Sequence, residues 1–295
     1  MSRIAVLLLM AIISPLTAGA EIQTKKILYG GLGRSFQIYT PASLDRILGP
    51  RPLVLVLHGG GGSSREVRYS TRGRFETLAD ENGFFVLYPD AIGRIWDTGG
   101  GQMSEGLSPR RDDTGFLLAV IRLAVESYPI DTARIFATGV SRGGMESYAL
   151  GCRKPSPLRA IAPVAMPLPE ASAEACATGV PLGFLLIHGT ADPFVPYEGG
   201  PINIGRRDRD TVLSAEATMA LFVERNRCFS PVEETIGTVR HTDWWGCAVP
   251  TGFYSVGGGG HGWPGGRKVI PGGRAGPVNT DITAADEIWK FFSRF

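Results

Sequence analysis

Short apolar runs alternate along this chain of 295 residues with longer segments of helical spacing. Strands are expected at residues 35–39, 53–57, 84–88, 134–138, 160–164, 184–187 and 253–256, and helices at 65–82, 115–128, 143–152, 212–225 and 284–292. Apolar strands separated by helices predict a mostly parallel sheet that is covered by helices on both faces. Because ligands bind such sheets beyond the carboxyl ends of the strands, the residues that follow each strand are the first candidates for function.

The N-terminal segment is not expected to belong to this fold. Arg3 is followed by an apolar run over residues 4–13 and then by Ala18, Gly19 and Ala20, an order that is typical of a secretory signal peptide. The run is too short to cross a bilayer, which takes about 20 residues. We therefore expect a signal peptide over residues 1–20, a single domain over residues 21–295, no membrane span, and a secreted or periplasmic protein.

The four cysteines form an even set in a chain that is expected to be exported, which favours disulfides. Of the three possible pairings, proximity in the sequence favours Cys152–Cys176 and Cys228–Cys247; one or more free buried thiols are the alternative. The spacing of these cysteines does not match a zinc-ligand pattern, so no metal site is expected.

The charge of the chain is nearly balanced, with a formal net charge of +2. Its densest basic cluster, at residues 206–209, is interrupted by Asp208 and followed by Asp210. Nucleic-acid binding needs a basic stripe, and this pattern offers none, so no nucleic-acid partner is expected.

A Gly-x-Ser-x-Gly motif lies between an expected strand and an expected helix. It reads Gly139-Val140-Ser141-Arg142-Gly143. In this context the motif forms the sharp strand-to-helix turn that exposes the nucleophilic serine of the α/β-hydrolase fold. Ser141 is the expected nucleophile, and the backbone N–H of Arg142 is expected to point at the developing oxyanion. An ordinary turn serine is the alternative.

A serine hydroxyl needs a base, and the chain has four histidines. In this fold the chain order is serine, then acid, then histidine, which removes His58. His188 leaves no room for an acid in a later loop, and His241 lies in a polar stretch with no expected strand before it. His261 follows an expected strand and the glycine run 257–260, which lets a loop approach the serine. His261 is therefore the expected base.

The acid is expected in a loop that follows a strand between Ser141 and His261. Asp192 follows the expected strand at 184–187 and would orient the imidazole of His261 through its second ring nitrogen. Asp208, Asp210 and Asp243 lie in charged or irregular segments and are weaker candidates. An Asp-Pro turn is the alternative role for Asp192.

The glycine-rich run 58–62 directly follows another expected strand. Glycines let backbone N–H groups approach a ligand, so this loop is expected to complete an oxyanion hole with Arg142. Gly60 is the first candidate donor and Gly61 the second. A phosphate cradle would need a Gly-Lys-Ser/Thr or dinucleotide-binding pattern, which this run lacks. His58 is expected to orient the loop.

Six motifs together resemble those of secreted poly(3-hydroxybutyrate) depolymerase-like esterases and of feruloyl and acetyl-xylan esterases. They are Leu57-His58-Gly59-Gly60-Gly61-Gly62, Asp112-Asp113-Thr114-Gly115-Phe116, Asp131-Thr132-Ala133-Arg134-Ile135, Gly139-Val140-Ser141-Arg142-Gly143-Gly144-Met145, His188-Gly189-Thr190-Ala191-Asp192 and Gly260-His261-Gly262-Trp263-Pro264-Gly265.

The resemblance implies an α/β-hydrolase fold, a mostly parallel twisted sheet flanked by helices, with Ser141, Asp192 and His261 as the triad. It also implies a Cys228–Cys247 bridge. Arg142 departs from the group, which often has Asn or a small residue there, so the preference near the scissile ester is in question. Since family members differ in substrate, either acyl esters of plant polysaccharide or a bacterial polyester could be the natural substrate.

Tryptophans are candidates for an aromatic or sugar subsite. Trp263, two residues after His261, is the best of them, and Trp96 is the second; Trp244 and Trp245 are further candidates. Packing is the alternative role for each of them. The loops at 92–111 and 196–209 are expected to shape the entrance.

The expected reaction is hydrolysis of a carboxylic ester through an acyl-enzyme, without a metal or organic cofactor. The alternatives are a hydroxyalkanoate oligomer depolymerase, a peptidase, and a secreted binding protein that kept the fold without catalysis. The chain has no room for the additional domain that a peptidase often carries, and an intact set of Ser141, Asp192 and His261 argues against a binding protein.

Overall fold

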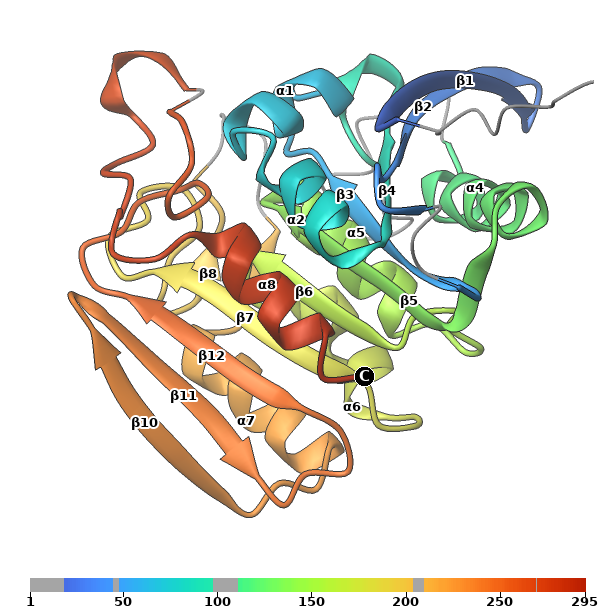
Figure 1. Ribbon diagram of the computed structural model, residues 1–295. Coiled ribbons are helices and arrows are strands. Elements are labelled where there is room, and N and C mark those ends of the chain that lie inside the picture. Colours follow the sequence, from blue (N-terminus) through green and yellow to red (C-terminus); the bar gives the residue numbers. More distant parts are fainter. Residues whose placement is uncertain (1–18, 45–47, 98–110, 204–209, 269) are drawn as a thin grey trace, which may run out of the picture.

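A ten-stranded sheet runs through the molecule in the order β1-β2-β4-β3-β5-β6-β7-β12-β11-β10 (Figure 1). The computed structural model describes residues 19–295 except 45–47, 98–110, 204–209 and 269, so most of the expected signal peptide lies outside the described residues. The strands are β1 Glu21–Tyr29, β2 Leu32–Thr40, β3 Arg51–Leu57, β4 Phe85–Pro89, β5 Ile130–Val140, β6 Ala160–Val164, β7 Gly183–Gly189, β10 Ser230–Ile236, β11 Val239–Trp245 and β12 Thr251–Val256. A separate two-stranded ribbon pairs β8 Gly200–Pro201 with β9 Thr211–Val212.

The centre of the large sheet is parallel and its two edges are antiparallel. The pairs from β4 through β3, β5, β6 and β7 to β12 are all parallel. β1 and β2 on one edge, and β11 and β10 on the other, pair antiparallel. Every residue of β3, β4, β6, β7 and β12 is buried, as expected for parallel strands that are covered on both faces.

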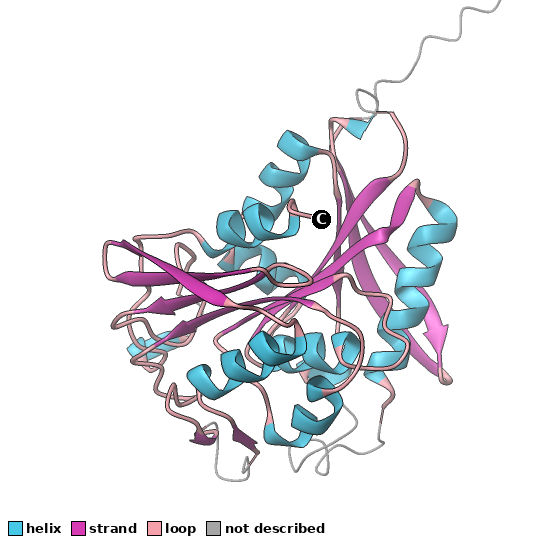
Figure 2. Ribbon diagram, turned by 90° about the horizontal axis from the view of Figure 1, so that it is seen from below, coloured by secondary structure: helices cyan, strands magenta, loops and turns pink. Residues whose placement is uncertain are grey.

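Helices cover both faces of this sheet (Figure 2). They are α1 Ser64–Ser70, α2 Arg74–Asn82, α4 Asp113–Ser127, α5 Arg142–Gly151, α6 Ala173–Ala177, α7 Ala215–Arg225 and α8 Ala284–Phe292, with short 3-10 turns at Ile92–Arg94, Glu170–Ser172 and Pro271–Gly273. One core cluster joins α4, α5 and α7 to one face of the strands. The other joins α1, α2 and α8 to the opposite face. The predicted mostly parallel sheet between two helical layers is therefore confirmed.

Two of the expected helices differ from those observed. The stretch 65–82 is divided into α1 and α2, because Arg72 and Gly73 take left-handed backbone conformations, with φ of 57° and 66°. The expected helix at 212–225 begins only at Ala215, because the Ser214 side chain accepts a hydrogen bond from the N–H of Ala217 and caps it there. Val212 belongs to β9 instead.

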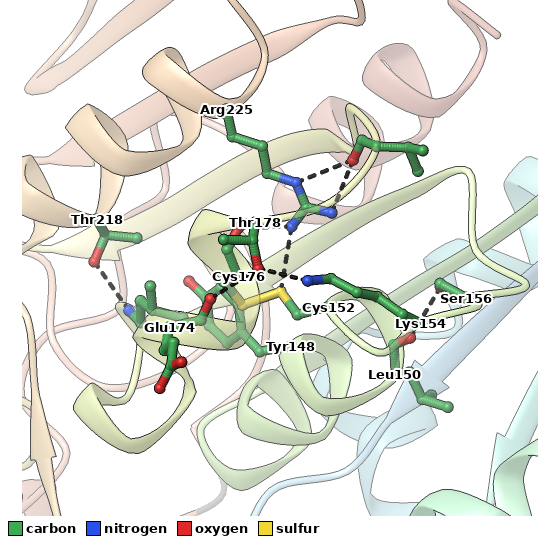
Figure 3. The surroundings of a disulfide bond; sticks show 12 residues. Tyr148, Leu150, Cys152, Lys154, Ser156, Glu174, Cys176, Thr178, Thr218 and Arg225 are labelled. Atoms are coloured by element: carbon green, nitrogen blue, oxygen red, sulfur yellow. Dashed lines mark hydrogen bonds between the residues drawn. A yellow bond between two sulfur atoms is a disulfide. The ribbon is translucent and has the colours of Figure 1, made fainter.

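The two disulfides expected from sequence proximity are confirmed, and no free cysteine is present in the described chain. Cys152–Cys176 joins the end of α5 to α6 (Figure 3). Arg225, at the end of α7, donates a hydrogen bond of 2.9 Å to the carbonyl oxygen of Cys176 and lies 3.6 Å from the sulfur of Cys152. The bridge and the arginine thus tie three helices together on one face of the sheet.

Candidate active site

Ser141 lies at the turn between β5 and α5, with a φ of 56° and a ψ of −122°. A residue with a side chain rarely adopts such a positive φ, and strained backbone of this kind occurs at functional sites. Hydrogen bonds fix the turn on both sides: the N–H of Ser141 donates to the carbonyl oxygen of Val164, and its carbonyl oxygen accepts from the N–H of Met145. The predicted strand-to-helix turn is therefore present, with the serine at its tip.

The two glycines of the motif are required by close backbone contacts. A Cβ atom on Gly139 would lie 2.4 Å from the carbonyl carbon of Gly143. A Cβ atom on Gly143 would lie 2.4 Å from the carbonyl oxygen of Leu57, at the end of β3. The turn thus crosses directly over the neighbouring strand, and this brings Ser141 next to the glycine loop that follows β3.

Asp192 and His261 form a buried hydrogen-bonded pair. The Oδ2 atom of Asp192 lies 2.7 Å from Nδ1 of His261. Its Oδ1 atom accepts the backbone N–H groups of Phe194 and Val195 at 2.9 and 3.0 Å. The carboxylate oxygens are therefore divided between the turn and the ring. When Nδ1 of the neutral ring donates its hydrogen to Asp192, Nε2 is left as the acceptor that a general base needs.

The glycine run before His261 allows the loop to pass close to two other segments. A Cβ atom on Gly189 would lie 2.2 Å from the carbonyl oxygen of Gly259, and one on Gly260 would lie 2.2 Å from that of Ala275. Ala191 donates its N–H to Gly259 at 3.0 Å, and His261 donates its N–H to Ala275 at 2.6 Å. These contacts hold the histidine loop against the turn that carries Asp192.

One cavity of about 570 Å³ brings these elements together. Ser141, Arg142 and His261 line it, along with the glycine loop at residues 59–62. Of the chain's four histidines, His261 is the one that lines this cavity. The sequence-predicted nucleophile, base and oxyanion donors therefore share one space, and Asp192 lies behind the base.

The backbone hydrogen bonds distinguish the two glycine donors that the sequence left open. Gly61 donates its N–H to the carbonyl oxygen of Arg94 at 2.8 Å, so this group is already occupied. Among the described residues, no hydrogen bond uses the N–H of Gly60. A Cβ atom on Gly60 would lie 3.1 Å from Cδ of Arg142, so this part of the loop adjoins the first residue of α5. The geometry thus favours Gly60 over Gly61.

His58 holds the glycine loop in place through hydrogen bonds at both ring nitrogens. Its Nε2 atom accepts the N–H of Ala91 at 3.1 Å, so Nδ1 carries the hydrogen and donates to the carbonyl oxygen of Gly59 at 2.7 Å. Burial lowers the pKa of this histidine, which agrees with a neutral ring. Both ring nitrogens are used within the fold, which agrees with the orienting role expected for His58.

The prediction that Trp96 contacts substrate is wrong. Trp96 is fully buried: its ring packs on His58 with the centroids 4.8 Å apart, and its N–H donates to the carbonyl oxygen of His58 at 2.8 Å. Its place in the sequence, in a polar loop after β4, gave no sign of this burial. Trp244 and Trp245 lie on β11 and do not line the cavity.

Trp263 does line the cavity, although only 4% of its surface is exposed. Its ring meets Phe75 edge-on, and its buried indole N–H has no hydrogen-bond partner among the described residues. Its role in binding stays a prediction.

The remaining acid and base candidates lie elsewhere. His241 is on β11 and bonds to Glu234 at 2.8 Å, and Asp243 bonds to Arg294 at 2.8 Å. Asp210 lies just before β9, and Asp208 is outside the described residues.

His188 is buried beside Asp192, with Nδ1 4.0 Å from Oδ2 of that carboxylate. Burial lowers the pKa of His188 to about 4, so it is neutral at pH 7.

Sequence reasoning missed part of the cavity wall. Phe194 meets the ring of His261 edge-on, with centroids 5.3 Å apart, and described residues from 267–268 and 270–278 supply another side. The expected entrance loop at 92–111 contributes Arg94 and Ile95, whereas its residues 98–110 and residues 204–209 of the other loop lie outside the described part of the chain. No regular pattern marks these walls, so only their proximity to Asp192 and His261 could have indicated them.

The sequence of this chain is similar to those of esterases. "Putative esterase NocK" of Nocardia uniformis subsp. tsuyamanensis is 29% identical over 294 residues, covering 91% of this chain and 83% of the relative. Feruloyl esterase C of Emericella nidulans is 28% identical over 271 residues, covering 88% and 84%. No family model matches the sequence.

Among solved structures, an acetyl xylan esterase from Aspergillus awamori superposes with a TM-score of 0.59 and 15% identity, covering 92% of this chain and 99% of that one. At this identity the likeness shows the fold, which is that of the α/β-hydrolases. In the described residues no helix is long and apolar enough to span a membrane.

Proposed function

We propose that this chain, a carboxylic ester hydrolase that is similar in sequence to feruloyl and acetylxylan esterases, uses Ser141, His261 and Asp192 as its catalytic triad. One observation carries the proposal. Oδ2 of Asp192 lies 2.7 Å from Nδ1 of His261, and the ring that it orients shares a cavity with Ser141 at the strained turn before α5.

In the first half of the reaction, Nε2 of His261 takes the proton of the Ser141 hydroxyl as its oxygen attacks the ester carbonyl carbon. The negative charge that develops on the carbonyl oxygen is stabilised by the N–H groups of Arg142 and Gly60. Arg142 is the first residue of α5, where the helix dipole also favours negative charge. Each such donor accounts for about 100- to 1,000-fold in kcat.

In the second half, His261 returns the proton to the leaving alcohol, and Ser141 is left as an acyl ester. Water then attacks this ester while Nε2 of His261 takes a proton from it, and His261 returns that proton to the Ser141 oxygen as the bond to the acyl group breaks and the carboxylic acid leaves. The carboxylate of Asp192 stabilises the imidazolium each time that it forms.

Feruloyl and acetyl esters of plant polysaccharide or oligosaccharide are the proposed substrates, because relatives named for feruloyl and acetylxylan ester hydrolysis match this chain. Trp263, which lies two residues from His261 and lines the cavity, is the proposed contact for an aromatic or sugar ring. We place the mature enzyme outside the cytoplasm, with residues 1–20 as a signal peptide and residues 21–295 as its catalytic domain. The two disulfides support this location.

The test is turnover of methyl ferulate, p-nitrophenyl acetate, p-nitrophenyl butyrate and a 3-hydroxybutyrate oligomer by the mature protein and by its Ser141→Ala variant. The proposal expects hydrolysis of at least one ester by the wild type and loss of about 10⁴-fold or more in kcat in the variant. If kcat/KM is highest for the 3-hydroxybutyrate oligomer, the proposed substrate becomes a polyester instead of a carbohydrate ester. A loss of less than about tenfold in kcat in a well-folded Ser141→Ala protein would remove the serine from the mechanism.

A further inference from the structure

The charges that line the catalytic cavity are nearly all positive. Among the described residues, five cationic residues line it but only one carboxylate residue, Glu66; the cations are Arg94, Arg142, Arg267, Lys268 and Arg274. The whole chain carries a formal net charge of only +2, so this excess is local to the cavity. A concave surface of one charge sign concentrates ligands of the opposite sign.

Most of these cations have no ionic partner in the fold. Within the part of the chain that the structure describes, no carboxylate lies within 4.0 Å of Arg94, Arg267, Lys268 or Arg274. Some arginines outside the cavity are held within 2.9 Å of a carboxylate oxygen, such as Arg74, Arg134, Arg240 and Arg294, whereas others, such as Arg153 and Arg159, form no ion pair with the described residues. Within the described part of the chain, Arg94, Arg267, Lys268 and Arg274 therefore do not serve as structural ion pairs.

Three of the cations lie on the same wall, which we call the cationic rim and define as Arg267, Lys268 and Arg274. All three are exposed to solvent, so their charges are available to a ligand. The guanidinium of Arg267 lies over the ring of Tyr69, 4.7 Å from its centroid, and the N–H of Arg267 donates to the carbonyl oxygen of Ser70 at 2.7 Å. This end of the rim is therefore anchored to α1.

The other end of the rim is tied to the catalytic histidine. The N–H of His261 donates to the carbonyl oxygen of Ala275, the residue after Arg274, at 2.6 Å. The lone carboxylate is on a different wall: a Cβ atom on Gly62 would lie 2.4 Å from Oε2 of Glu66, beside the glycine loop. Arg94, whose Nε donates to the carbonyl oxygen of Gly62 at 3.0 Å, is the cation on that wall. The negative charge of Glu66 therefore does not compensate the positive charges of the cationic rim.

We propose that the ester this enzyme prefers carries a carboxylate of its own, which the cationic rim of Arg267, Lys268 and Arg274 binds while Ser141 attacks the ester. The inference rests on the proposed function and narrows its substrate to an anionic class. The same charge chemistry fits a carboxylate on the acyl part, as in the half-ester of a dicarboxylic acid, or on the alcohol part, as in an acyl ester of a hydroxy acid or uronic acid.

Two matched substrate pairs distinguish these sources. Monomethyl and dimethyl succinate differ by a carboxylate on the acyl side, and acetoxyacetate and methyl acetoxyacetate differ by one on the alcohol side. The measured quantity is the ratio of kcat/KM for the anionic ester to that for its neutral partner. It is compared among the wild type, the double variant Arg267→Gln/Lys268→Gln, Arg274→Gln and a control, Lys26→Gln, which removes a positive charge from β1 away from the cavity.

The expected result is that the double variant lowers the anionic-to-neutral ratio about tenfold for one pair, that Arg274→Gln lowers it severalfold, and that Lys26→Gln leaves it unchanged. The pair that responds identifies the side that carries the carboxylate. The wild-type ratio is also expected to decrease when NaCl is raised from about 20 mM to about 500 mM, because salt screens exposed charges. Equal ratios in the wild type and the double variant would overturn the inference while the proposed function stood.

Binding to the Ser141→Ala protein separates the two proposals if no ester is cleaved. Ligand-detected NMR with monomethyl and dimethyl succinate, and with acetoxyacetate and its methyl ester, does not need turnover. Absence of hydrolysis together with binding of the anionic esters alone would remove the proposed function and keep the anion site. Equal binding, or none, of the anionic and neutral esters would remove the anion site.

Discussion

At the scale of single residues, the site depends on how Asp192 divides its two oxygens. Oδ1 is held by two backbone N–H groups of its own turn, and Oδ2 faces Nδ1 of His261. His188 approaches the same Oδ2 atom only to 4.0 Å, and burial holds the pKa of His188 far below its ordinary value. The carboxylate is thus fixed by the turn and has one ring to orient.

Replacing Asp192 with Asn is expected to lower kcat by about 10³- to 10⁴-fold, because an amide can donate a hydrogen to Nδ1 and so favours the wrong tautomer of His261. The Oδ1 atom of Asn can still accept both backbone N–H groups, so the fold is expected to persist in near-UV circular dichroism. Asp243→Asn, in an earlier acid candidate that bonds to Arg294 on the surface, is the control and should keep wild-type kcat. A loss below tenfold in Asp192→Asn would mean that another group orients the base.

Sequence reasoning identified Ser141, Asp192 and His261 because each must follow a strand, and chain order then leaves few choices. The same reasoning could not place Trp96 or Phe194. Whether a loop side chain faces the cavity or the core depends on which backbone groups lie beside it, and for Trp96 these are those of His58. The place of Arg267 and Arg274 on the cavity wall was also missed, because their segment follows no periodic pattern.

At the scale of elements, the approach of β5 to β3 decides the position of the nucleophile. A methyl group on Gly143 would lie 2.4 Å from the carbonyl oxygen of Leu57 and 2.7 Å from that of His58, and neither backbone atom can move without shifting β3. Gly143→Ala is therefore expected to lower the free energy of unfolding by about 3 kcal/mol. Urea denaturation measures it, with Gly33→Ala on β2 as control, where a Cβ meets nothing within 4 Å. Equal midpoints in the two variants would contradict the contact.

The Cys152–Cys176 bridge closes a loop of 24 residues between α5 and α6. In the chain-entropy model, a loop of this length stabilises the fold by about 3 kcal/mol through its effect on the unfolded chain. The Cys152→Ala/Cys176→Ala variant should lose about that much in urea denaturation while it keeps its far-UV spectrum. The same double replacement at Cys228 and Cys247 should cost a similar amount, since its loop of 19 residues is nearly as long. If neither urea midpoint changes, removing the disulfide does not increase the conformational entropy of the unfolded chain appreciably.

The central strands were predictable because each contains a short, mostly apolar run, whereas the strands at the edges of the sheet lack one. β1 and β10 have mostly exposed or half-buried side chains, so polar residues fill them and no apolar run marks them. β11 was read as a polar stretch without a strand, although it pairs with β12 from Val239 to Asp243. Edge strands gain their structure from a neighbour's backbone, which leaves little trace in their own residues.

At the scale of the whole molecule, buried titratable groups couple stability to pH in two directions. Burial raises the pKa of Glu146, on α5, to about 8 from an ordinary 4.5, and Oε1 of Glu146 accepts the hydroxyl of Thr114 at 2.7 Å. Burial lowers the pKa of His188 to about 4 from 6.5. Asp113 shifts in the direction of Glu146 and His58 in that of His188, also through burial. Near pH 6 the fold therefore holds Glu146 protonated and His188 neutral.

Glu146 and His188 oppose each other at mildly acidic pH. Above pH 4.5 the unfolded chain ionises Glu146 while the folded chain keeps it protonated, so stability falls with rising pH until about pH 8. Below pH 6.5 the unfolded chain protonates His188 while the folded chain does not, so stability falls with falling pH until about pH 4. Each slope is about 1.4 kcal/mol per pH unit. The two cancel between pH 4.5 and 6.5, and Glu146 alone governs the range from pH 6.5 to 8.

Glu146→Gln is therefore expected to flatten the decline of stability above pH 6.5, since an amide has no proton to lose. The wild type should lose about 2 kcal/mol of unfolding free energy between pH 6.5 and pH 8, and the variant much less. Urea denaturation followed by tryptophan fluorescence at pH 5, 6.5 and 8 measures the unfolding free energy of both proteins. The quantity to compare is the change in unfolding free energy with pH in each protein, not its absolute value. His188→Asn should instead raise the relative stability at pH 5. Parallel curves for wild type and Glu146→Gln above pH 6.5 would show that Glu146 is already ionised in the folded protein.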